Sequence, residues 1–393
     1  MKVLYIHQYF RTPQEGGAIR SYYLAKGLVD NGIEVDLITS FNEDKADSKV
    51  IDGIHVHYLP VHYENEQGFL RRLIAFFRFM FLAIRKAKEI GKADVVYATS
   101  TPLTIGLIAL KIKQQLGVPY YFEVRDLWPE APFQMGVIKN RFLKKYLKSL
   151  EQKVYRHAEK IIALSPGIKT LIKEENPELT VEVIPNMSDV DFFAPESKHP
   201  DLEALFGVKK QFVVSYFGAI GRSNHLEYIL AAANAALRAD MPVVFFIIGQ
   251  GSELKKLKYL TRHFDLDNVR FLDFQNKYNL KRVLNITDAA YVSFASRPIL
   301  ETNSPNKFFD ALASGKLIIT NTRGWVKEIC EANNCGFYYD PDVPQDFVDK
   351  LLPFIENRSQ LEIFQSSARS VGESQFAREA QVNKLVDLLH MNH

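Results

Sequence analysis

The stretch SPNKFFDALASGKLIIT, residues 304–320, joins a helix pattern to a short apolar run that is typical of a buried strand. Ser304 suits the N-cap of the helix and Pro305 its first position, because proline lacks the N–H that would stay unbonded there. The apolar residues Phe308, Phe309 and Leu312 are spaced to share one face, which we expect to be in the core.

The same alternation of helix patterns and apolar runs extends along the whole chain. Strands that alternate with helices indicate βαβ units and a parallel sheet. The sequence therefore predicts an α/β protein with two Rossmann-like, doubly wound domains facing each other across a cleft. The predicted domains span residues 1–188 and 200–375, and a C-terminal helix at 376–393 packs back on the first domain. The predicted strands lie at 3–7, 35–39, 93–98, 119–124 and 160–164, and then at 212–217, 243–248, 269–272, 289–294 and 317–320.

Composition and charge exclude several classes of protein. The chain has 393 residues, is 47% hydrophobic and 24% charged, and carries a net charge of +3, which is far from the strongly basic character of nucleic-acid-binding domains. Cys330 and Cys335 have no second pair of metal ligands nearby, so we interpret them as core thiols in a reducing compartment. The N-terminal sequence runs directly into a strand pattern without the features of a signal peptide. These observations favour a cytoplasmic location.

The start of the helix after Ser304 is suited to an anion. Free N–H groups and the positive end of the helix dipole attract phosphate or carboxylate, yet Lys307 adds a further cation to the first turn. Asn306 and Asp310, at i,i+4 spacing, share the exposed face with that lysine. This local conflict of charge indicates an anionic ligand.

Two glycine-containing loops follow strands of the second predicted domain. In FGAIGR, Gly218 would allow close backbone approach and Arg222 could clamp phosphate oxygens; the alternative is a solvent-facing arginine in a turn. In IGQGSEL, Gly249 and Gly251 could admit the base or ribose of a ligand. The first domain has Gly16 and Gly17 before its first helix but no GxGxxG, which counts against a nicotinamide dehydrogenase.

Charged residues at strand ends are the candidates in the first domain. EVRDLWPEAP offers the carboxylates of Glu123, Asp126 and Glu130 after a predicted strand, and Arg125 either neutralises one of them or takes part in the chemistry. His7 ends the first strand and is the histidine best placed for an active site. No metal-ligand spacing stands out, so we predict no metal.

Residues 69–90 combine five phenylalanines with six basic residues. Charges interrupt the segment too often for a membrane-spanning helix. Two interpretations remain open, a core helix of the first domain or an interfacial helix that touches anionic lipid. A second basic amphipathic segment at 140–157 adds to the membrane-surface alternative.

Taken together, the glycine loop at 16–17, EVRDLWPE, ALSPGIK, VIPNMSDVDFF, FGAIGR and SPNKFFDALASGKLIIT resemble the retaining glycosyltransferases of family 4, which have the GT-B fold. The resemblance covers nearly the entire chain and is strongest to bacterial transferases of O-antigen, capsule and exopolysaccharide synthesis. It implies a UDP-linked or other nucleotide-sugar donor, no cofactor and no metal. It also implies a lipid-linked or polysaccharide acceptor, often involving amino or deoxy sugars, and a place in the cytoplasm or at the inner face of the membrane.

The resemblance also assigns roles to residues. The family has two glutamates separated by seven intervening residues. Asp310 matches the second, which binds the ribose, while Thr302 occupies the first position and Glu301 lies one residue early. Asn224 occupies the position of a phosphate-binding lysine. The implied catalytic residues are Asp126, Arg222, Lys307 and Glu301. The implied donor-binding residues are Gly16, Gly17, Gly218, Arg222, Gly249, Gly251, Ser304, Asn306, Lys307 and Asp310.

Two other functions remain open at this point. A nucleotide-sugar epimerase of the same architecture would need acid–base groups but no acceptor. A catalytically silent subunit that binds a sugar nucleotide would fit the loss of the glutamate at position 302.

Overall fold

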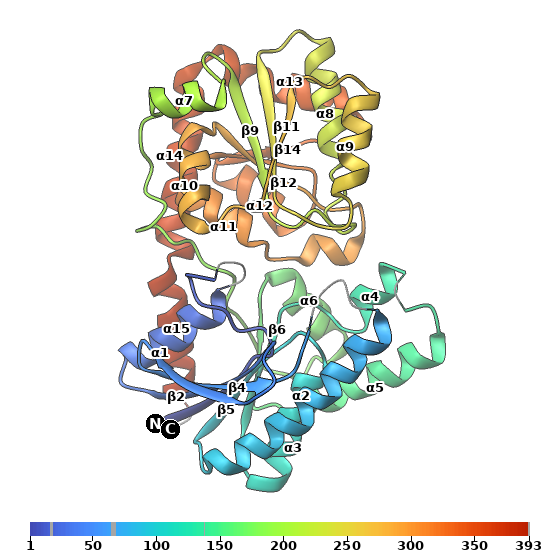
Figure 1. The fold of residues 1–393 in the computed structure, drawn as a ribbon, viewed down its shortest axis with the longest axis vertical. Helices are drawn as coiled ribbons and strands as arrows, with labels where there is room; N and C mark the ends of the chain where they lie inside the picture. Colours follow the sequence, from blue (N-terminus) through green and yellow to red (C-terminus); the bar gives the residue numbers. More distant parts are fainter. Residues whose placement is uncertain (16–18, 64–67, 137, 392–393) are drawn as a thin grey trace. The chain divides into compact units, whose positions relative to one another are not determined.

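The computed structural model describes residues 1–15, 19–63, 68–136 and 138–391, and it divides the chain into two compact units (Figure 1). Unit 1 consists of Met1–Pro185 and Glu379–His393, and unit 2 of Asn186–Arg378. The segment after Pro185, where the sequence suggested a boundary, therefore groups with unit 2. The helix α15 (Arg378–His390) returns to unit 1.

Unit 1 is built on an eight-stranded sheet in the order β3-β4-β2-β1-β5-β6-β7-β8, in which only the β3–β4 pair is antiparallel. Its strands are β1 (Lys2–Ile6), β2 (Glu34–Phe41), β3 (Asp47–Ile51), β4 (Ile54–Pro60), β5 (Val95–Thr99), β6 (Tyr120–Val124), β7 (Lys160–Ala163) and β8 (Val181–Val183). Besides α15, its helices are α1 (Arg20–Asp30), α2 (Phe69–Ile90), α3 (Thr104–Leu116), α4 (Glu130–Gln134), α5 (Arg141–His157) and α6 (Pro166–Glu175).

Helices cover both faces of this sheet. Strands β5 and β6 are buried along their whole length, as expected for parallel strands covered on both sides. Gly27 of α1 lies directly against Val382 of α15, and Gly106 of α3 lies against Val154 of α5. Right-handed crossovers place α2, α3 and α5 together on the face opposite α1. Connections run in opposite directions on the two sides of β1, so the carboxyl ends of β1 and β5 form the switch point where such sheets bind ligands.

Helix α2 combines features of both interpretations offered for residues 69–90. Phe79 and Ala83 are fully buried, so one face belongs to the core. On the opposite face Ile74, Phe77 and Phe81 are 66%, 46% and 75% exposed. No helix in the part of the chain that the structure describes is long and apolar enough to cross a bilayer.

Unit 2 is built on a parallel six-stranded sheet in the order β11-β10-β9-β12-β13-β14. Its strands are β9 (Phe212–Phe217), β10 (Val243–Ile248), β11 (Val269–Leu272), β12 (Ala289–Val292), β13 (Leu317–Thr320) and β14 (Gly336–Tyr338). Its α-helices are α7 (Pro200–Phe206), α8 (Glu227–Arg238), α9 (Leu254–His263), α10 (Lys277–Ile286), α11 (Asn306–Ala313), α12 (Trp325–Ala332), α13 (Pro344–Glu356) and α14 (Arg358–Phe376), and a 3₁₀ helix η1 spans Pro298–Thr302.

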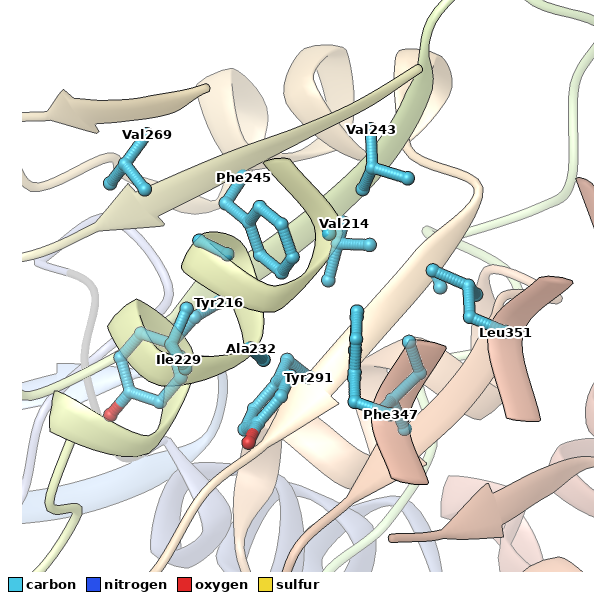
Figure 2. Close-up of a cluster of buried hydrophobic side chains, with 14 of the residues drawn as sticks. Val214, Tyr216, Ile229, Ala232, Val243, Phe245, Val269, Tyr291, Phe347 and Leu351 are labelled. Carbon is cyan, nitrogen blue, oxygen red and sulfur yellow. The ribbon is translucent and has the colours of Figure 1, made fainter. Parts of the chain in front are cut away.

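An apolar cluster fixes the central strands of unit 2 (Figure 2). The ring of Phe245 on β10 lies 5.7 Å from that of Phe347 on α13, and Val214 of β9 belongs to the same cluster. The hydroxyls of Tyr291 and Tyr339 are hydrogen-bonded within it. Because this core holds β9, β10 and β12 in register, it also fixes the loops that leave their carboxyl ends.

Each strand predicted from the sequence is confirmed, with ends that shift by a few residues. The structure adds the strands β3, β4, β8 and β14, which were not predicted from the sequence. Cys330 and Cys335 are both buried and free, as the interpretation of core thiols requires.

Candidate donor-binding site

The ammonium group of Lys307 lies at the carboxyl end of β9, against the glycine loop. Its Nζ donates to the hydroxyl of Tyr216 at 3.2 Å and to Oδ1 of Asn224 at 3.1 Å. It lies 4.5 Å from the centre of the Tyr216 ring and 5.4 Å from that of Phe294. A Cβ on Gly218 would be 3.1 Å from Cε of the lysine, so only glycine leaves this space open.

This lysine has neutral partners but no counter-charge. Within 4.0 Å of Nζ there is no carboxylate oxygen among the residues that the structure describes. Burial lowers the pKa of Lys307 from 10.5 to about 7. The site is thus prepared for an anion, whose charge would restore the ordinary pKa.

The start of α11 differs from the prediction in its cap. The helix begins at Asn306 with Pro305 in the N-cap position, and no side chain caps it. The hydroxyl of Ser304 instead accepts the backbone N–H of Asn186 at 3.2 Å, so the prediction that Ser304 caps the helix was wrong. In the described part of the chain, the backbone N–H groups of Asn306 and Lys307 have no acceptor and remain available to an anion.

Two loops meet beside this helix start. The N–H of Gly218 donates to Ile248 O at 3.0 Å, and a Cβ on Gly249 would lie 2.0 Å from Gly218 O. A Cβ on Gly251 would lie 2.3 Å from the backbone oxygen of Ile220. Gly218, Gly249 and Gly251 have φ values of 141°, 142° and 155°, which side chains rarely tolerate. The glycines predicted to bind the donor therefore allow the two loops to pack on each other.

Asp310 occupies the second turn of α11 and is half-buried. Burial raises the pKa of its carboxyl to about 7; the Lys277 ammonium lowers it, and the Asp189 carboxylate raises it further. Its carboxylate has no hydrogen-bond partner among the described residues, so it is free to accept bonds from a diol. Asn306 is exposed one turn earlier, and the predicted apolar face of the helix is confirmed as buried.

The residues around the missing glutamate belong to η1. The hydroxyl of Thr302 donates to Ile299 O at 2.8 Å, a hydrogen bond within the same turn of η1. Glu301 is half-buried, and its backbone and Cβ lie against Gly324, whose φ is 78°. The carboxylate of Glu301 makes no ion pair within the described residues.

Arg222 does not contact Lys307 in the structure. Its side chain is 85% exposed and its Nε lies 3.4 Å from Oε1 of Glu253. The solvent-facing arginine that the sequence allowed as the alternative describes this conformation. A role of Arg222 in binding phosphate stays a prediction.

Of the candidate carboxylates of unit 1, two are held in ion pairs and one makes no ion pair within the described residues. Glu123 is fully buried and accepts from Arg20 at 2.8 and 3.0 Å and from the Tyr97 hydroxyl at 2.6 Å, so it is part of a structural ion pair. The sequence allowed Arg125 to neutralise one of the three carboxylates, and for Glu123 the partner is Arg20 instead. Glu130 pairs with Lys144 at 2.8 Å.

Asp126 is exposed and makes no ion pair within the described residues, which leaves it available to a substrate.

Gly16 and Gly17 lie outside the described residues. The aromatic surroundings of Lys307 were missed; the one available signal was a tyrosine, Tyr216, at the carboxyl end of a predicted strand.

Comparison with known proteins places these features in a family. The family model "Glycosyltransferase Family 4" matches residues 15–192, and the model "Glycosyl transferases group 1" matches residues 201–371. The probable glycosyltransferase WbjE of Pseudomonas aeruginosa is 21% identical over 282 residues, covering 70% of this chain and 69% of the relative. The putative colanic acid biosynthesis glycosyl transferase WcaI of Escherichia coli K12 is 28% identical over 121 residues, 30% of this chain and 29% of the relative.

A solved structure supports the same assignment of the fold. HepE (Alr3699) from Anabaena, crystallised in complex with UDP-glucose, superposes with a TM-score of 0.74 at 18% identity, covering 100% of both chains. Two parallel-sheet units, this similarity and two family matches that follow one another along the sequence lead to one conclusion. The chain belongs to the family 4 glycosyltransferases and has the GT-B fold.

Proposed function

We propose that this glycosyltransferase moves a sugar from a UDP-linked donor to a lipid-linked or growing polysaccharide acceptor of bacterial surface polysaccharide synthesis, with retention at the anomeric carbon. The donor binds unit 2 and the acceptor binds unit 1. Neither a metal nor a cofactor takes part.

The observation that carries this proposal is the half-buried ammonium of Lys307 without a counter-ion. A cation in such a place is costly unless a ligand brings negative charge. The unbonded N–H groups of Asn306 and Lys307 supply further donors to the same region. A diphosphate satisfies all of them, and its developing charge on departure would be stabilised by these preorganised groups.

The remaining parts of the donor have candidate partners on the same helix and loops. Asp310 accepts hydrogen bonds from the ribose hydroxyls. Glu301 takes the place of the missing glutamate at Thr302 and contacts the transferred sugar. The relative HepE binds UDP-glucose on the same fold, which supports UDP as the nucleotide. Arg222 turns from Glu253 toward the phosphate when donor binds.

In the reaction, the departing phosphate accepts the proton of the acceptor hydroxyl on the same face of the sugar. This front-face course explains retention without a protein nucleophile. Asp126 contacts the acceptor or the transferred sugar. The protein's contribution is then largely orientation and electrostatic stabilisation of the leaving diphosphate.

The acceptor proposal is supported by the outer face of α2. Its exposed Ile74, Phe77 and Phe81 lie beside exposed Arg71 and Arg78. Apolar side chains among basic ones are typical of helices that lie in a membrane interface with anionic lipids. Such contact would bring unit 1 to a lipid-linked acceptor at the inner face of the membrane.

A turnover experiment tests this function. Purified protein is incubated with a panel of UDP-sugars, with and without bacterial membranes that contain lipid-linked acceptors, and released UDP is measured. Release of UDP that depends on membranes supports transfer. Isomerisation of the sugar nucleotide without acceptor would instead indicate an epimerase, and binding without turnover a silent subunit.

A further inference from the structure

The carboxyl edge of the unit 1 sheet holds a cation that the proposed function does not use. Arg125 follows β6, and its half-buried guanidinium donates from Nη1 to Nε2 of His7 at 3.4 Å. The backbone N–H of Arg125 donates to Oγ of Ser100 at 3.0 Å. These residues follow three neighbouring strands, β1, β5 and β6.

The partner of this guanidinium carries no negative charge. The side chain of His7 is buried, with 2% of its surface exposed. Because Arg125 can only donate, Nε2 of His7 must be unprotonated to accept its hydrogen bond. Burial and the charge of Arg125 hold the pKa of His7 well below its usual range. The ring proton then sits on Nδ1, which has no partner among the described residues. His7 is therefore a neutral support for Arg125.

Nearby carboxylates do not neutralise Arg125 either. In the described part of the chain, none of their oxygens lies within 4.0 Å of its guanidinium. Glu123 is already bonded to Arg20 and to Tyr97. Asp126 is exposed to solvent beside it. A guanidinium has five N–H donors, and His7 takes one of them, so most remain for a ligand.

The position of this group is where a ligand is expected. Ligands of doubly wound sheets bind outside the carboxyl ends of the strands, at the switch point, which here lies between β1 and β5. His7 and Ser100 follow these two strands directly. An arginine at such a place, held by neutral partners, matches the planar, bidentate geometry of phosphate and carboxylate.

We infer that Arg125 binds an anionic oxygen group of the acceptor, a phosphate or a carboxylate, and that His7 is the positioning residue that holds its guanidinium. This inference rests on the proposed function, which places the acceptor on unit 1. A lipid-linked acceptor brings a phosphate, and an acidic sugar brings a carboxylate. An acceptor without either would leave the guanidinium unpaired, so Arg125 selects against neutral acceptors.

Calorimetric titration of the full chain tests this inference. UDP is first titrated, and unit 2 is then kept saturated with UDP so that a second diphosphate cannot bind there. The two probes are dimethylallyl diphosphate, which is too short to report membrane contact, and glucuronate. The variants are Arg125→Gln, Arg125→Lys, His7→Gln and His7→Leu, with Arg156→Gln on the exposed surface of α5 as the matched control.

We expect Arg125→Gln to weaken binding of one probe by about tenfold or more, as loss of a charge-assisted hydrogen bond does. Weaker binding of the diphosphate identifies the lipid phosphate, and weaker binding of glucuronate identifies a sugar carboxylate. Arg125→Lys keeps the positive charge but lacks the two-pronged guanidinium. Its affinity for the probe should therefore lie between those of the wild type and Arg125→Gln. His7→Gln should retain affinity because its amide oxygen can accept from Arg125, whereas His7→Leu should lose it.

Two results would overturn the inference: wild-type protein that binds neither probe, or Arg125→Gln that binds both as the wild type does at an unchanged melting temperature. If UDP binds normally, either result contradicts the inference about Arg125 but not the assignment of the donor site to unit 2. Wild-type protein that fails to bind UDP would contradict the proposed function instead. The probes would then be titrated without UDP, and weaker binding by Arg125→Gln than by Arg156→Gln would still decide on Arg125.

Discussion

Replacing Lys307 by methionine should stabilise the unliganded protein and weaken UDP binding. In the folded protein burial lowers the pKa of Lys307 to about 7, whereas the unfolded chain has the ordinary value of 10.5. This difference corresponds to at most about 4–5 kcal/mol. Because water still reaches the half-buried ammonium, we expect a net gain of about 1–2 kcal/mol in Lys307→Met. UDP affinity should fall by about tenfold or more, through loss of a charge-assisted hydrogen bond.

The pH dependence follows from the same values. A lysine whose pKa is lower in the folded state holds fewer protons there than in the unfolded chain, so stability rises from pH 7 towards 10.5. A bound phosphate raises the pKa of Lys307 again. Above pH 7, UDP binding should therefore take up a proton, and affinity should decline with increasing pH.

Calorimetry in two buffers of different ionisation enthalpy measures this proton uptake at pH 8, and thermal unfolding measures stability. Lys255→Met, at an exposed position of α9, is the matched control and should change neither. Proton uptake in the wild type that disappears in Lys307→Met is the expected result. Equal uptake in both proteins, or unchanged UDP affinity in Lys307→Met, would refute the assignment of Lys307 to the diphosphate.

Three further outcomes are expected. Gly249→Ala should cost about 2–4 kcal/mol in urea unfolding, because its Cβ would overlap the neighbouring loop, while Gly221→Ala, with open space around it, should cost little; equal costs would contradict the loop contact. Glu123→Gln should cost about 3–5 kcal/mol at neutral pH, since it leaves a buried arginine unpaired; a stable variant would show that the pair is dispensable. Burial acts to raise the pKa of Glu123, but the charge of Arg20 outweighs it and lowers that pKa. The ion pair therefore adds to the stability of the folded protein at neutral pH, and this stabilisation is lost as the pH falls. Phe77→Ser with Phe81→Ser should reduce flotation on anionic liposomes, and flotation that is unchanged would exclude α2 as the contact.

The fold was largely predictable because the inner strands of both sheets are nearly continuous apolar runs between helix patterns. The strands that were missed lack this signal: β3 at Asp47–Ile51 is mostly exposed and polar. A local signal for the β3–β4 hairpin did exist, since Asp52 and Gly53 form a turn with φ values of 48° and 83°.

The site was predictable only where its parts are close in sequence. Lys307, Asp310 and the buried face of α11 follow from one helix pattern. The prediction that Ser304 caps α11 was wrong because its hydroxyl accepts the backbone N–H of Asn186, 118 residues earlier in the chain. In the same way, Glu123 is bonded by Arg20 across 103 residues rather than by the neighbouring arginine. No local pattern carries the information for such contacts.

A crystal structure with bound UDP tests the central claim most directly. We expect a phosphate oxygen within about 3.2 Å of Nζ of Lys307, a further phosphate oxygen at the N–H groups that open α11, and the ribose at Asp310. A diphosphate bound elsewhere on unit 2, with Lys307 still bonded only to Tyr216 and Asn224, would contradict it.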